Sequence, residues 1–129
     1  MTTNTTLFHS IRYRDAAAAL DYLAAGLGLE RTAAYFSPDD PTRVEHAQMS
    51  WPGGGGIMFG SASDGAPTGV AFAYLVLVDD ADVDRVHQRA LDHGFTTVRE
   101  PADMEYGGRG STVADPEGNE WSLGSYRGE

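Results

Sequence analysis

Apolar and polar positions along the first half of the chain predict one strand, one helix and three more strands. Residues 7–13 mix apolar and polar side chains at the spacing of a strand. Residues 16–27 carry leucines at helical spacing in an Ala-rich run. Asp15 is placed to cap this helix and Gly28 to end it. Short β-prone runs follow at residues 32–36, 44–51 and 57–59. The pattern is therefore β-α-β-β-β.

The second half of the chain repeats this series. Residues 72–78 form a nearly continuous apolar run, which is typical of a buried strand. Asp80 is placed to cap a second amphipathic helix, and Gly94 ends it. The remaining expected elements are a strand at 95–98, a long loop at 100–108, a strand at 110–114 and a closing strand at 121–125.

The clearest sign of the repeat is the end of each half. Residues 121–125 (WSLGS) align with residues 57–61 (IMFGS), and each run follows a turn rich in Gly and Pro. Residues 62–69 are small and polar and read as a linker. We therefore expect one α+β domain over residues 1–129, built from two βαβββ modules at about 7–61 and 70–126 that share one core.

Composition narrows the class of partner. The chain carries 19 Asp and Glu against 9 Lys and Arg, a formal charge of −10. This charge repels phosphate backbones and anionic lipid, so no nucleic acid and no membrane is expected as a partner, and a neutral or cationic small molecule fits better. There is no cysteine. The polar N-terminus shows no signal peptide and no apolar run approaches the ~20 residues of a membrane span, so we expect a soluble, cytoplasmic protein.

Three stretches together resemble the vicinal oxygen chelate superfamily, which includes glyoxalase I, extradiol dioxygenases and bleomycin-resistance proteins. They are residues 12–15 (RYRD), 27–29 (LGL) and 115–123 (DPEGNEWSL), and residues 44–60 and 104–123 are most similar to its small bacterial glyoxalase-like and bleomycin-resistance-like branch. The resemblance implies that the two modules form an incomplete curved barrel, with a ligand site on the concave face and usually a homodimer.

In metal-using members, four side chains on the first and last strands of the modules hold a divalent cation. The resemblance, with Asp15 and Asp80 as reference points, places these positions on Phe8, Ala73, Met58 and Ser122. None of them is a His, Gln or Glu, so the sequence predicts neither a metal nor another cofactor. A register shift of one residue would bring in His9, Tyr74 or Glu120 instead.

Several other residues could contact a ligand. His46 and Gln48 share one face of a strand, and Tyr106 and Arg109 lie in the long loop, where the family often places an aromatic residue and an arginine over the pocket mouth. His87 and His93 are expected on the solvated side of the second helix. The full candidate set for ligand binding is Phe8, Ser10, His46, Gln48, Met58, Ala73, Leu75, Tyr106, Arg109 and Ser122.

The sequence favours a metal-free protein that binds, and thereby sequesters, an apolar or cationic aromatic small molecule, as in antibiotic resistance. The alternative is a glyoxalase-like lyase, dioxygenase or isomerase with a non-standard active site, in which His46, Tyr106 or Arg109 handles protons. A third possibility is a domain whose dimer or partner interface is its function, which predicts a filled cavity.

Overall fold

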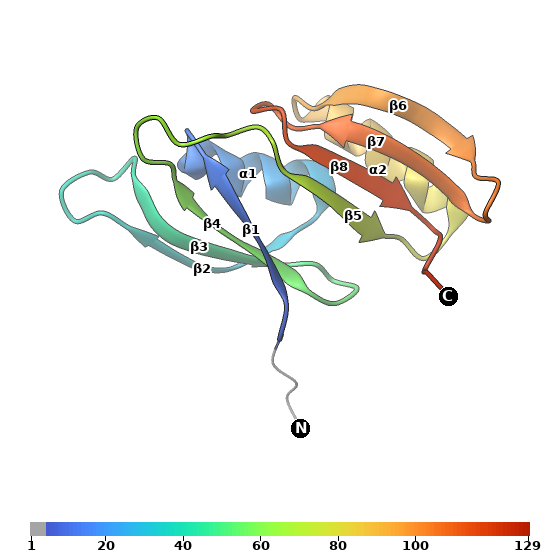
Figure 1. The fold of residues 1–129 in the computed structure, drawn as a ribbon, viewed down its shortest axis with the longest axis horizontal. Helices are drawn as coiled ribbons and strands as arrows, with labels where there is room; N and C mark the ends of the chain where they lie inside the picture. Colours follow the sequence, from blue (N-terminus) through green and yellow to red (C-terminus); the bar gives the residue numbers. More distant parts are fainter. Residues whose placement is uncertain (1–4) are drawn as a thin grey trace.

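The computed structural model describes residues 5–129 as two four-stranded sheets, each with one helix (Figure 1). The elements are β1 (Phe8–Tyr13), α1 (Ala16–Leu27), β2 (Glu30–Phe36), β3 (Val44–Ser50), β4 (Gly56–Ser61), β5 (Phe72–Val76), α2 (Asp80–Asp92), β6 (Thr96–Asp103), β7 (Arg109–Ala114) and β8 (Glu120–Gly124). The strand orders are β1-β4-β3-β2 and β5-β8-β7-β6. This confirms the predicted α+β class, with paired βαβββ units and no closed barrel.

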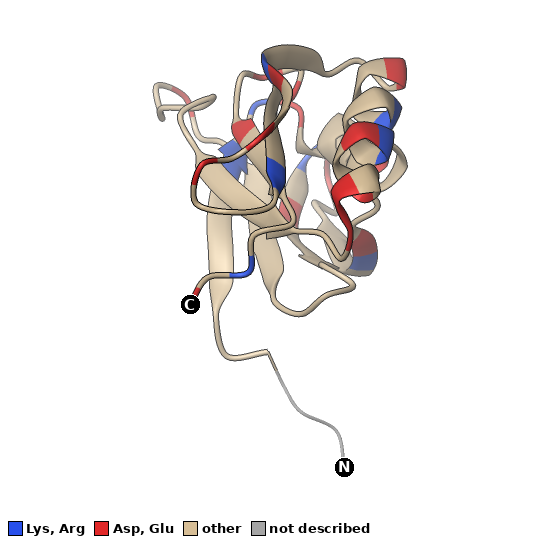
Figure 2. Ribbon diagram, turned by 90° about the vertical axis from the view of Figure 1, so that its right-hand side faces the viewer, with Lys and Arg blue, Asp and Glu red and all other residues tan. Residues whose placement is uncertain are grey.

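The two sheets repeat one register. Ser10 pairs with Met58 in the first sheet, and Tyr74 pairs with Ser122 in the second. Both helices lie on the same side of the sheets (Figure 2), and strand residues that face them, such as Ile11 and Leu123, are buried in the core. Because side chains alternate along a strand, the neighbouring positions face the other way. We call the side of the sheets away from the helices the open face.

A buried carboxylate joins the two modules. Asp115 is 4% exposed, and its Oδ2 atom accepts the hydroxyl proton of Tyr13 at 2.7 Å, from the end of β1. The same side chain accepts hydrogen bonds from the Glu117 and Asn119 backbone N–H groups and from the Trp121 indole. A buried carboxylate without such donors would destabilise the fold by several kcal/mol. Tyr13 is the only one of these donors that comes from the first module.

The second module also holds both ends of α1. The Glu117 carboxylate accepts the N–H groups of Arg14 and Asp15 at 2.7 and 2.8 Å, where the chain enters α1. At the other end, the Arg89 guanidinium of α2 donates to the carbonyls of Ala24 and Ala25 at 3.1 and 2.6 Å. Negative charge at the start of a helix and positive charge at its end both stabilise it. These contacts fix α1 against the second module.

Two expected boundaries in the second module are wrong. The N-cap of α2 is Asp79, and the Asp82 carboxylate accepts its N–H at 3.2 Å, so the helix starts one residue earlier than the cap at Asp80 implied. The loop expected at 100–108 is shorter, because β6 continues to Asp103 through a register shift between Arg99 and Ala102. Neither α1 nor α2 has the length and apolar character of a membrane-spanning helix.

His87 is buried, so its expected place on the solvated side of α2 is wrong. The side chain is 4% exposed, with Nδ1 at 2.7 Å from the Ser111 hydroxyl and Nε2 at 2.9 Å from the Thr97 hydroxyl. Burial lowers the pKa of His87, while the negative charges of Glu100 and Asp84 oppose this shift. Two hydroxyl partners on neighbouring strands make the buried ring compatible with the core.

The junction can be tested with two tyrosines that differ in whether their hydroxyl is bonded. Tyr13→Phe removes a hydrogen bond to a buried carboxylate and should lower the free energy of unfolding by about 1.5–3 kcal/mol. Tyr22→Phe is the matched control, since the Tyr22 hydroxyl is buried and has no hydrogen-bond partner among residues 5–129. This variant should be neutral or stabilising by up to about 1 kcal/mol. Urea unfolding measures both. Equal losses in the two variants would show that the Tyr13–Asp115 bond has no special role.

The buried histidine predicts a pH dependence of stability. His87 has a lower pKa in the fold than in the unfolded chain, so the unfolded chain takes up the proton more readily as the pH falls below about 6.5. His87 therefore makes the protein less stable as the pH falls through this range, until the pH is below the pKa in the fold. Urea unfolding should show a smaller drop in stability between pH 7.5 and pH 5.5 for His87→Gln than for the wild type. Gln88→Ala, at an exposed position of the same helix that does not titrate, should leave the drop unchanged.

Candidate functional site

Tyr74 stands where three cavities adjoin. It lines cavities of about 540, 310 and 220 Å³, which lie around β5. Tyr74 is 43% exposed and points to the open face, opposite Ser122 in the sheet register. Pockets that hold small organic ligands usually measure ~300–1,000 Å³. The adjoining spaces around Tyr74 are therefore large enough to take a small molecule.

The largest of these cavities has aromatic walls. We call it the tyrosine pocket; it measures about 540 Å³ and is lined by Tyr74, Val76, Tyr106, Tyr126, Arg127 and Gly128. The Tyr74 hydroxyl donates to the Tyr126 carbonyl at 2.8 Å, and the rings of Tyr106 and Tyr126 meet edge to face with centroids 4.9 Å apart. Three rings from β5, the β6–β7 loop and the C-terminal segment thus converge on one space.

Two glycines form the floor beside the tyrosine pocket. Gly110 of β7 and Gly124 of β8 are register partners. A Cβ atom on Gly124 would overlap the Tyr74 hydroxyl, and one on Gly110 would lie 3.5 Å from Nη2 of Arg99. A side chain on Gly124 would therefore occupy the space of the Tyr74 ring, and one on Gly110 would press on the Met104 methyl group, 3.0 Å away, and touch the Arg99 guanidinium. The glycine pair lets Tyr74 lie across β8 and brings Arg99 next to it.

The second cavity opens between the edges of β1 and β5. It measures about 310 Å³, and Phe8, Trp51 and Trp121 supply aromatic surface to it. The Trp51 indole donates to the Val76 carbonyl at 3.2 Å, and Trp51 also lines the cavity of about 220 Å³ beside Tyr74. Trp51 is half-buried, whereas Trp121 is buried in the core. Trp51 is therefore the tryptophan placed to report on a ligand at Tyr74.

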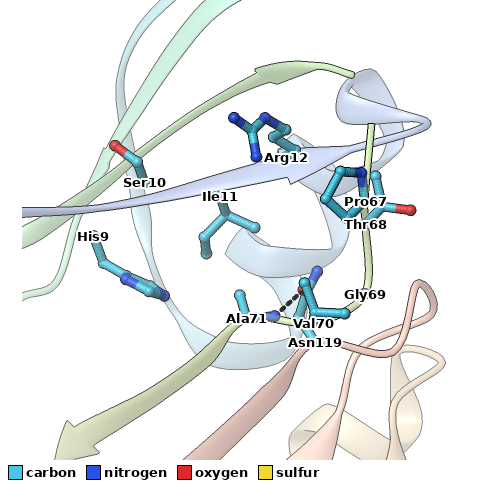
Figure 3. Close-up of a pocket in the computed structure, with 10 residues that line it drawn as sticks. All are labelled: His9, Ser10, Ile11, Arg12, Pro67, Thr68, Gly69, Val70, Ala71 and Asn119. Carbon is cyan, nitrogen blue, oxygen red and sulfur yellow. Dashed lines mark hydrogen bonds between the residues drawn. The ribbon is translucent and has the colours of Figure 1, made fainter. Parts of the chain in front are cut away.

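A fourth cavity, of about 390 Å³, lies at the other end of the space between β1 and β5 (Figure 3). Its walls are residues 9–12 of β1, residues 67–71 and Asn119. Ser10 and Arg12 point to one side of β1, and His9 and Ile11 to the other (Figure 3). The Asn119 side chain accepts the Ala71 N–H at 3.0 Å. This cavity borders the segment that connects the two sheets.

The structure separates the predicted ligand-binding residues. Tyr106 lies in the tyrosine pocket, Phe8 in the cavity between β1 and β5, and Ser10 in the cavity of Figure 3. The remaining residues of the first sheet, His46, Gln48 and Met58, lie together on its open face. Gln48 pairs with Met58, and the His46 ring stacks on Tyr35 with centroids 6.5 Å apart.

Ala73 and Leu75 do not face the open side, contrary to the expectation. The register of β5 turns them towards the helices, with Leu75 only 6% exposed, although both reach the edge of the 310 Å³ cavity. The open-face residues of β5 are Phe72, Tyr74 and Val76. The error comes from the expected N-cap of α2. The positions in β5 were counted back from Asp80, whereas the N-cap is Asp79, so each expected position is one residue too late and falls on the opposite face of the strand.

Arg109 does not lie over the pocket mouth. Its Nε and Nη2 atoms donate to the Asp84 carboxylate of α2 at 2.7 and 2.9 Å, and Nη1 lies 3.3 Å from Asp103. These hydrogen bonds lower the pKa of Asp84 and raise that of Arg109. Arg109 therefore braces β7 against the helix on the side of the sheet away from the ligand cavities.

The positions that would hold a metal carry no suitable donors. Met58 presents a thioether, and the Ser122 hydroxyl is buried and 2.9 Å from that of Thr112. The open-face residues of β5 are aromatic or apolar. On β8, the carboxylate nearest to Ser122 is that of Glu120. Within residues 5–129, no three His, Asp or Glu side chains converge as metal ligands. A divalent cation needs several convergent donors, so the residues present do not fit one.

Comparison with known proteins agrees with this architecture. A family model described as the "Glyoxalase/Bleomycin resistance protein/Dioxygenase superfamily" matches residues 5–123. The chain belongs to this superfamily. Among solved structures of its fold, TioX from Micromonospora sp. ML1 is 23% identical with a TM-score of 0.72, covering 93% of this chain and 94% of that one. A member from Sphaerobacter thermophilus is 25% identical with a TM-score of 0.68, covering 92% of this chain and 96% of that one.

Closer sequence identity is confined to a short stretch. Over 43 residues, the chain is 51% identical to uncharacterized proteins of Mycobacterium bovis and Mycobacterium tuberculosis. The stretch is 33% of this chain and 28% and 25% of those two proteins, so the chain spans about a quarter of the curated relatives it matches. Superfamily membership establishes the fold around the site, whereas the chemistry of the site is set by the side chains of this chain.

Sequence reasoning missed the residues that make the tyrosine pocket. Tyr74 entered only as a possible register shift, and Val76, Tyr126, Arg99 and Arg127 were not singled out. One signal was available. If the two modules are aligned on Asp15 and Asp79, Ser10 and Tyr74 become equivalent positions, and both then fall on the open face.

Proposed function

We propose that this superfamily member binds an aromatic small molecule at the tyrosine pocket, without a metal, and sequesters it unchanged. The observation that supports this most is the convergence of Tyr74, Tyr106 and Tyr126 on a cavity of about 540 Å³. Rings of this kind hold a planar ligand by edge and face contacts in addition to apolar burial. Sequestration of a toxic aromatic compound, as in drug resistance, is the simplest role for such a site.

A second copy of the chain is the partner that we propose. Several large apolar side chains remain exposed along β5 and the segments beside it, among them Val70, Phe72 and Val78 at 77%, 62% and 69%. Monomers rarely leave so much apolar surface together in water. Sedimentation equilibrium should give the mass of a homodimer at micromolar concentration, and a monomer across the accessible concentration range would contradict this proposal.

The competing function is an enzyme with a non-standard active site. His46, half-buried on the open face of the first sheet, and Tyr106 are the side chains available for proton transfer. A displaced metal site would have to use donors outside the expected positions. Elemental analysis of the purified protein separates the proposed function from a metal-dependent enzyme. We expect no stoichiometric metal, and one equivalent of Ni, Zn, Fe or Mn, removed by a chelator together with glyoxalase-type turnover, would favour the enzyme.

Binding at the tyrosine pocket can be tested with a neutral aromatic probe. Tyr74→Ala removes the ring shared by the three adjoining cavities and should weaken binding of 2-naphthamide about tenfold, because an aromatic contact and its buried area are lost. Tyr35→Ala is the matched control, since Tyr35 is an exposed tyrosine on β2 and lines none of these cavities. Calorimetric titration measures both. Unchanged affinity in Tyr74→Ala would exclude the tyrosine pocket.

A further inference from the structure

The tyrosine pocket of this acidic protein has two positively charged side chains at or near its walls. The formal charge of −10 predicts a preference for cations. However, the pocket is lined by Arg127, and Arg99 lies beside Tyr74 over the glycine floor. Charges separated by more than about 8–10 Å are largely screened at physiological salt, so the nearest groups decide which ligand charge is favoured. Two of the charged groups closest to this pocket are arginines.

These two arginines are available to a ligand. Three other arginines form ion pairs with carboxylates, namely Arg43, Arg85 and Arg109. Among residues 5–129, neither Arg99 nor Arg127 lies within 4.0 Å of a carboxylate oxygen, and both are exposed. They come from different elements, β6 and the C-terminal segment, and both reach the surroundings of Tyr74.

One carboxylate lies at the pocket wall and already accepts a hydrogen bond there, and a second is paired with an arginine. Glu129 accepts the Tyr126 hydroxyl proton at 2.7 Å, and Asp103 pairs with Arg109. Burial and Tyr106 raise the pKa of the Tyr74 hydroxyl. The positive charge of Arg99 opposes this rise. Many acidic residues instead lie on the helices and loops (Figure 2). Arg99 therefore contributes a positive charge near the Tyr74 hydroxyl.

We propose that the tyrosine pocket selects an aromatic carboxylate, holding its ring among the tyrosines and its anionic group at Arg99 and Arg127. A guanidinium presents a planar fork of N–H donors that matches a carboxylate and also stacks on aromatic rings, so both parts of such a ligand have partners. This inference rests on the proposed function and replaces the apolar or cationic ligand expected from the sequence with an anionic one.

Three probes that share one ring system test the choice of charge. Calorimetric titration of the wild-type protein with 2-naphthoate, 2-naphthamide and 2-naphthylmethylammonium compares an anion, a neutral isostere and a cation. We expect 2-naphthoate to bind at least tenfold more tightly than the amide, and the cation to bind most weakly. Equal affinities for the carboxylate and the amide, or tightest binding of the cation, would overturn the anion preference and leave the aromatic site standing. Failure of all three probes to bind would overturn the proposed function as well.

The two arginines are tested by a double substitution. Arg99→Gln with Arg127→Gln should reduce the affinity for 2-naphthoate to that for 2-naphthamide while leaving the amide unchanged. Arg85→Gln is the matched control, because Arg85 is an exposed arginine of α2 paired with Asp82. It should alter neither affinity. An anion preference that survives the double substitution would contradict the assignment. Circular dichroism should show that each variant remains folded, because the replaced side chains are exposed.

Discussion

The structure depends on placing a carboxylate in the core and supplying its donors from both modules. Asp115 lies at the turn into β8, where its own turn satisfies most of its acceptor capacity and Tyr13 completes it from β1. A buried charge tolerates little displacement of its partners, because a lost donor leaves it unsatisfied. The hydrogen bond therefore fixes the end of β1 against the second sheet. Glu117 and Arg89 extend this control to both ends of α1.

The first module contacts the second at the corresponding position of the repeat, but through a different residue. The turn before β4 contacts the end of β5 through the Trp51 indole, which donates to the Val76 carbonyl. The two sheets are thus tied at both ends of the gap between β1 and β5, and the cavities lie between and beside these ties. In the positions where related metal enzymes carry chelating side chains, this chain has a thioether and a buried hydroxyl, and its aromatic residues gather one strand away around Tyr74.

Much of the fold was visible in the sequence, because turns and caps have strong local preferences. The prolines, glycines and aspartates that bound the elements recur in the same order in both halves, which predicted two βαβββ units. The faces of β5 were not predicted, because two successive aspartates could each cap α2 and the choice of Asp80 inverted them. The burial of His87 and the ion pair of Arg109 with Asp84 depend on residues distant in sequence, and no local pattern reveals them.

We propose that the ligand binds on the second sheet around Tyr74, away from the first sheet. Backbone amide NMR of the labelled protein, titrated with 2-naphthoate, tests this most directly because every strand reports separately. We expect the largest shifts at Val76, Gly110, Gly124 and Arg127, with little change along β3. Shifts centred on His46, Gln48 and Met58, with the residues around Tyr74 unchanged, would contradict it.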